Sequence, residues 1–155
     1  FQGVVEGTIQ QTIGVVRLQV DYTSPLSDLI KACSLDWVSG HITEKNFPIA
    51  KRPNGEVEFR MYHFNRTISS DQVIQEMDKE GYRPVELPEA LAYAKANPDE
   101  QRKYPIAVLG SVWRISIGGW CVPYLVEWQV GRVLPLNSYG YSWNADCRFL
   151  AVRKS

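Results

Sequence analysis

The sequence predicts an α+β fold in which two helices pack on a twisted antiparallel sheet. The prediction rests on the order of hydrophobic patterns along the chain. Residues 56–65 alternate as a strand, residues 69–97 carry two helical stripes, and four strand-like segments follow at 106–109, 122–125, 132–136 and 147–152. With 155 residues, 45% of them hydrophobic and no internal repeat, the chain can bury a core of its own.

Residues 1–55 are expected to form an N-terminal extension that packs on, or precedes, a main domain of residues 56–155. Weak alternation in residues 1–22 suits two extended segments that turn near Gly14. Ser24 and Pro25 predict the start of a short helix, with the serine as its cap. Residues 34–55 look irregular and end at an Asn54-Gly55 turn.

The two helices of the main domain have clear start and stop signals. Ser69 and Gln72 are spaced as a capping box at the start of the first helix, and Gly81 suits its end. Pro88 begins the second helix, and Asn97-Pro98 stops it.

Charge and hydropathy exclude two classes of partner. The formal net charge is zero and no block of like charges is present, so the chain lacks the basic face that nucleic acid requires. No apolar run approaches the roughly 20 residues that cross a bilayer, so no membrane insertion is expected. Three cysteines leave at least one thiol unpaired, and pairing of Cys121 with Cys147 stays open.

The segment from Ser111 to Lys154 is unusually aromatic. It holds four of the five tryptophans, and between Trp113 and Trp143 only three side chains are charged. Glycine and serine residues interrupt it, which indicates loops rather than continuous buried strand. A mixture of Tyr, Trp, Ser, Gly and Asn is typical of binding faces built from loops.

Three segments of the sequence resemble the C-type lectin fold. They are Gly81–Pro84 leading into Leu87–Leu91, the strand from Ile106 to Trp113, and Gly140–Trp143 running into Cys147–Arg153. The first is also similar to the formylglycine-generating enzyme branch of that fold. The resemblance covers residues 56–154 and implies a lectin-type main domain.

Within that fold, the chain is most similar to the variable proteins of diversity-generating retroelements. Val122–Leu125, the spaced Arg132, Leu134 and Leu136, and Cys147–Arg153 look like the fixed scaffold of that family. The resemblance implies that the residues between them vary and face a ligand. Strand geometry agrees, since Leu134 and Leu136 share one face, which leaves Val133 on the other. Phe149 and Ala151 are likewise opposite Leu150 and Val152, so one face of each strand is expected to build the core and the other to be free to vary.

The expected ligand-binding residues of this variable face are nine. They are Trp120, Glu127, Trp128, Gln129, Val133, Asn137, Tyr139, Tyr141 and Ser142.

No metal, cofactor or catalytic group is expected. Trp143–Asp146 is similar to the calcium motif of sugar-binding lectins, but the partner motif before and after Pro123 is absent. The formylglycine-generating enzymes use a closely placed cysteine pair, and Cys147 has no near neighbour. No Ser-His-Asp, HExxH, CxxC or phosphate-loop pattern is present.

The sequence therefore favours a ligand- or receptor-binding protein over an enzyme. The resemblance implies display on a virus particle or a cell surface, with a protein or another surface ligand as the partner. Two alternatives are a formylglycine-generating type of oxidoreductase and a structural subunit of a virion. The ligand and the oligomeric state are not encoded in any motif.

Overall fold

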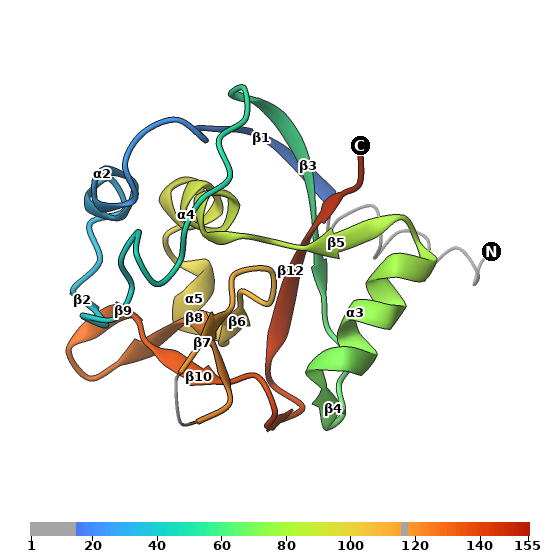
Figure 1. The fold of residues 1–155 in the computed structure, drawn as a ribbon. Helices are drawn as coiled ribbons and strands as arrows, with labels where there is room; N and C mark the ends of the chain where they lie inside the picture. The colour runs from blue at the N-terminus through green and yellow to red at the C-terminus, as the bar shows by residue number, and fades with distance from the viewer. Residues whose placement is uncertain (1–14, 116–117) are drawn as a thin grey trace.

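The computed structural model describes residues 15–115 and 118–155, and within them the chain forms twelve strands and four helices (Figure 1). The helices are α2 (Leu26–Lys31), α3 (Ser70–Lys79), α4 (Leu87–Ala96) and α5 (Glu100–Lys103). The strands are β1 (Val15–Val20), β2 (Trp37–Val38), β3 (Gly55–Tyr62), β4 (Ile68–Ser69), β5 (Tyr82–Pro84), β6 (Ile106–Ala107), β7 (Trp113–Arg114), β8 (Trp120–Trp128), β9 (Gly131–Leu134), β10 (Leu136–Ser138), β11 (Ser142–Trp143) and β12 (Arg148–Arg153).

Ten of these strands form one mixed sheet, and seven of them follow one another in the order β1-β3-β12-β6-β8-β9-β2. Strands β7 and β10 also pair with β8, and β5 pairs with β12, while β4 and β11 form a separate pair. Two neighbouring pairs, β12 with β6 and β2 with β9, are parallel. Sheet residues outnumber those in the short helices.

The predicted fold class is therefore wrong. The sequence predicted a C-type lectin fold, with two helices on an antiparallel sheet, but the structure is a sheet-rich fold with a large mixed sheet and four short helices among its described residues. Local alternation identifies a strand, but it does not specify the partner strand or its direction. The parallel neighbours are far apart in sequence, so no short turn signal marks them.

Strand β12 runs through the middle of the molecule, with α3 and α4 on opposite sides of it (Figure 1). Leu150 and Val152 belong to a core that includes α4, whereas Phe149 and Ala151 belong to a second core that includes α3. The sequence predicted one core face and one free face for this strand. Both faces are buried because helices cover the two sides of the sheet.

The capping signals place α3 and α4 as predicted. Ser69 and Gln72 form the capping box of α3, and Gly81 adopts a left-handed φ of 83° just after the helix. Pro88 lies in the first turn of α4. The predicted cap of α2 is wrong, because Pro25 occupies the N-cap position and the Ser24 hydroxyl donates to Asp21 instead.

Residues 15–55 contribute to the same sheet as the rest of the chain. Strand β1 pairs with β3 over six residues, and β2 lies beside β9. The predicted extended segment around Val4, Thr8 and Ile13 lies outside the described residues. None of the described helices is long and apolar enough to cross a membrane.

Candidate binding surface

The candidate binding surface includes two exposed tryptophans, one at each end of strand β8. It pairs with four strands, β6, β7, β9 and β10, and its central Val122 and Leu125 are fully buried. At its ends the side chains emerge into solvent, and Trp120 is 49% and Trp128 45% exposed. The strand therefore holds two exposed indole rings on a rigid base.

Beside the Trp128 end of β8 lies Trp37, a residue that the sequence did not predict as part of the binding surface. Trp37 of β2 lies with its ring centroid 5.5 Å from that of Trp128, and it is 44% exposed. Beside this pair, Arg102 of α5 donates to Glu127 over 2.5 Å, and Val130 is largely exposed. Trp37 stands here because β2 joins the sheet beside β9, a long-range pairing that no local signal indicates.

The Trp120 end of β8 borders an apolar pocket of about 330 Å³. The pocket is lined by Ile74, Leu109, Val112, Trp120 and Tyr139. Its residues come from α3, from the segment between β6 and β7, from β8, and from the residue after β10. The structure thus brings together Trp120 and Tyr139, two of the predicted binding residues.

Hydrogen bonds fix the Tyr139 wall of this pocket. The Tyr139 hydroxyl donates to Asp71 over 2.7 Å, and the Tyr139 amide donates to the Trp120 carbonyl over 2.8 Å. Burial, followed by the bond to Asp71, raises the pKa of Tyr139 to about 12. Beside the pocket, the Arg114 guanidinium lies 5.5 Å from the centre of the Trp120 ring.

The next two predicted residues are Tyr141, in the loop after β10, and Ser142, the first residue of β11. Tyr141 is 63% exposed, and Ser142 is exposed although its backbone pairs with Ser69 of β4. Trp143, expected to belong to the scaffold, is buried, and its indole donates to the Ser70 hydroxyl over 2.9 Å. The loop is therefore tied to α3 while the Tyr141 ring points outward.

The nine predicted residues fall into three groups in the structure. Six are exposed, namely Trp120, Glu127, Trp128, Gln129, Tyr141 and Ser142, and two, Asn137 and Tyr139, are half-buried.

Val133 was expected on the exposed face and is fully buried, which corrects the prediction. It lies in β9 between β8 and β2, so both edges of its strand are paired. The buried Gln101 of α5 donates to the carbonyls of Val126 and Val133, which places α5 over this part of the sheet. Alternation within β9 could not reveal that a helix covers the second face.

The cysteines are free thiols. Cys33 and Cys147 are buried, and Cys121 is half-buried. Burial raises the pKa of the Cys147 thiol to about 12, so this group is protonated at neutral pH and is a poor nucleophile.

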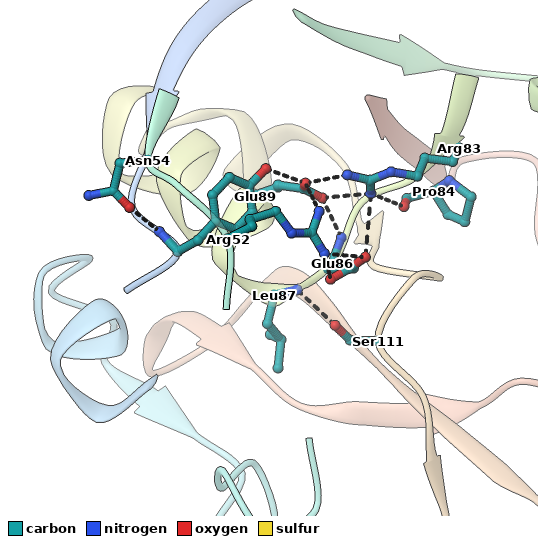
Figure 2. Close-up of polar contacts among 9 residues, drawn as sticks. Arg52, Asn54, Arg83, Pro84, Glu86, Leu87, Glu89 and Ser111 are labelled. Carbon is teal, nitrogen blue, oxygen red and sulfur yellow. Dashed lines mark hydrogen bonds and ion pairs between the residues drawn. The ribbon is translucent and has the colours of Figure 1, made fainter. Parts of the chain in front are cut away.

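A buried polar cluster surrounds Glu89 at the start of α4 (Figure 2). The carboxylate is fully buried and accepts from the Tyr22 hydroxyl at 2.5 Å, from Arg83 at 2.6 and 3.0 Å, and from the Glu86 amide at 2.8 Å. Arg52 lies beside it and pairs with Glu86 at 3.1 Å. Burial, and then the bond to Glu89, raises the pKa of Tyr22. Since its oxygens are fully occupied, Glu89 fixes the helix start rather than offering a ligand site.

Within residues 15–115 and 118–155 there is no group of three His, Cys, Asp or Glu side chains placed to hold a metal ion. The Asn144 side chain, part of the calcium-like phrase, instead accepts from the Asp146 amide.

Comparison with known proteins adds no relative. No protein-family model matches the sequence, and no curated protein or solved structure matches the chain. The resemblance to retroelement variable proteins therefore rests on the quoted sequence phrases alone.

Proposed function

We propose that this chain is a ligand-binding protein that recognises another protein through an aromatic surface formed by Trp37, Trp120, Trp128 and Tyr141. The observation that carries the proposal is the exposure of these four rings, each at least 44%, beside a sheet with closely packed cores. Large exposed aromatic side chains grouped on one scaffold are typical of interaction sites.

The rigid backbone that carries these rings favours recognition of a ligand. Trp120 and Trp128 project from a strand that is paired on both sides, so little ordering is required when a ligand binds. Ser138, Gly140 and Ser142 surround Tyr141 with small polar groups that suit adaptable hydrogen bonds. Rigid aromatic anchors among small polar residues are the composition of a protein-recognising surface.

A capture experiment tests this proposal. The wild-type chain and the variant Trp120→Ala/Trp128→Ala/Tyr141→Ala are immobilised, and proteins retained from a cell-surface extract are compared. We expect a protein that the wild type retains and the triple variant binds at least about tenfold more weakly, because buried aromatic anchors contribute about 2 kcal/mol each.

The matched control is Lys31→Ala/Lys45→Ala/Lys103→Ala, which changes three exposed residues outside the aromatic surface. It should retain the same protein as the wild type. If the aromatic triple variant and the wild type retain identical sets with equal affinity, the aromatic surface is not the recognition site and the proposal fails.

The proposal includes diversification of this surface. It is supported by the contrast between neighbouring positions, since Glu127, Trp128 and Gln129 are exposed while Val122, Leu125 and Leu134 are buried. Substitutions at the first group change the contact surface, whereas substitutions at the second create cavities or clashes.

Sequencing of the gene neighbourhood tests diversification separately. We expect a near-identical repeat that differs at adenines and changes codons for the exposed residues, beside a reverse-transcriptase gene. Differences spread equally over the codons for Leu125, Leu134 and Phe149 would refute diversification. Binding by a fixed aromatic surface would then stand on the capture experiment alone.

The oxidoreductase alternative is less well supported. A catalytic cysteine requires a thiolate, whereas Cys147 is buried and its raised pKa keeps it protonated at neutral pH. We expect Cys147→Ser to leave capture of the partner unchanged. Loss of an oxidative activity in a correctly folded Cys147→Ser protein would instead favour the enzyme.

A further inference from the structure

The pocket at the Trp120 end of β8 has a closed floor and an open rim. Leu109 at its base is 2% exposed and packs in the core that includes α3. Ile74, Val112 and Tyr139 are half-buried walls that pack on the same core. Trp120 is the exposed wall and lies outside both cores. A partner group that entered the pocket would therefore rest on fixed side chains and be covered by the Trp120 ring.

The volume and the apolar lining of the pocket favour an aromatic ring over a polar group as its occupant. An apolar cavity of about 150 Å³ is sufficient for benzene, and this pocket measures about 330 Å³. All five lining side chains are apolar or aromatic, and the Tyr139 hydroxyl is already bonded to Asp71. A polar group placed there would lose its hydrogen bonds to water, whereas an aromatic ring would gain contact area.

The charged side chains near the rim of the pocket favour a second chemical group in the ligand. Arg114 is exposed, stacks on Trp120 and forms no ion pair with the described residues. On the other side, Asp71 is in the first turn of α3, where the helix N-terminus compensates its charge, and it also accepts from Tyr139. Arg114 is thus the rim charge with capacity for a new partner, and that partner is a carboxylate.

We infer that this pocket receives one aromatic side chain of the protein ligand, and that a carboxylate next to that side chain pairs with Arg114. The inference rests on the proposed function, since it names the chemistry of the ligand at one end of the aromatic surface. It assigns Trp120 and Tyr139 to an anchor site and Arg114 to its charge selection.

Blocked dipeptides test the site without the natural partner. The probes are N-acetyl-Phe-Glu-amide, N-acetyl-Phe-Lys-amide and N-acetyl-Ser-Glu-amide, and the readout is the methyl NMR shifts of Ile74, Leu109 and Val112. We expect millimolar binding of both Phe probes, none of the Ser probe, and unchanged shifts for Val130, which lies in the turn beyond the far end of β8. The Glu probe should bind about threefold tighter than the Lys probe at low salt.

Four variants test which residues select the aromatic ring and which select the carboxylate. Arg114→Gln should remove the preference for the Glu probe while both Phe probes still bind. Ile74→Trp should fill the pocket and abolish binding, whereas Ile74→Leu, which keeps the volume, should bind as the wild type does. Val112→Phe serves as a second filling variant, and thermal unfolding confirms that each variant is folded.

The outcomes separate this inference from the proposed function. Absence of pocket shifts with all probes, or equal binding to folded Ile74→Trp and to the wild type, overturns the anchor site. A Glu preference that survives in Arg114→Gln overturns the role of Arg114. In either case a partner lost by the aromatic triple variant would leave the proposed function intact. Probe binding to the pocket without any such partner would overturn the proposed function, and of the inference only the affinity of the pocket for an aromatic ring beside a carboxylate would stand.

Discussion

At the scale of single residues, Arg132 connects three elements. Its side chain is buried and donates to the carbonyl of Cys33 at 2.9 Å and to that of Ala94 at 3.2 Å. These carbonyls lie at the C-terminal ends of α2 and α4, where a positive charge is favourable. The Arg132 amide donates to Asp36, the residue before β2, so the side chain holds the end of α2 and the backbone holds the start of β2 against β9.

We expect Arg132→Met to lower the free energy of unfolding by about 3 kcal/mol, because two buried carbonyls lose their donors. Chemical denaturation measures the change. The control is Arg102→Met, which removes an exposed arginine paired with Glu127 and should leave the unfolding midpoint nearly unchanged. Equal midpoints for the two variants would contradict this role of Arg132.

Residue exposure was the part of the candidate site that the sequence predicted best. Glycine and serine neighbours indicated loops around Tyr141, and that ring is exposed. The predicted exposure of Val133 was wrong because alternation describes a single strand and contains no information on what covers its second face. Trp37 was missed because its neighbour Trp128 is distant in sequence, and only the parallel pairing of β2 with β9 joins them.

At the scale of elements, the start of α4 depends on a buried carboxylate. Glu89 accepts hydrogen bonds from Arg83 of β5 (Figure 2) and from Tyr22, which follows β1, so one side chain ties β5 and the segment after β1 to the helix. The sequence predicted this helix from Pro88 but gave no sign that Glu89 is buried. Acidic residues in a first helical turn are ordinarily solvated, and only the packing of β1 and β5 encloses this one.

We expect Glu89→Gln to destabilise the protein by about 3 kcal/mol, because the amide nitrogen cannot accept the bonds that Arg83 and Tyr22 donate to this fully buried carboxylate. Thermal and urea unfolding would measure the loss. Glu76→Gln on α3 is the matched control, since Glu76 pairs with Lys79 at the surface and its loss should cost under about 1 kcal/mol. A stability loss for Glu89→Gln no larger than that of the control would show that the cluster is dispensable.

At the scale of the whole molecule, the sheet separates two cores that share β12. The strand segments around residues 56–65, 122–125 and 147–152 were predicted because hydrophobic patterns mark them locally. Their order in the sheet was not, because β12 lies between β3 and β6, and neither neighbour adjoins it in the chain. Sheet order is decided by which faces helices can cover, and that is a property of the complete chain.

Both cores contain tyrosines whose hydroxyl groups resist ionisation. Burial is the main cause of the raised pKa of Tyr22, Tyr62 and Tyr93, and it raises the pKa of Tyr104 and Tyr139 to about 12. In the unfolded chain these groups ionise near pH 10. The folded state therefore holds their protons more tightly, and this stabilisation is complete below pH 10 and is lost as the pH rises from about 10 to 12.

We expect the urea midpoint to fall steadily between pH 10 and pH 12. Tyr139→Phe should show a shallower fall, since it removes one group with a raised pKa. A midpoint that stays constant through this range, or an identical slope in the variant, would contradict the assignment.

Strand β8 also sets a distance. Trp120 and Trp128 are eight positions apart on one strand, which at about 3.3 Å per residue separates their backbones by about 26 Å. A partner with two matching epitopes at that spacing would bind both ends at once, and the first contact would raise the effective concentration for the second. A shorter peptide would reach one end only and forgo this gain. The length of β8 therefore favours partners whose two epitopes are separated by this distance, in addition to those with matching chemistry.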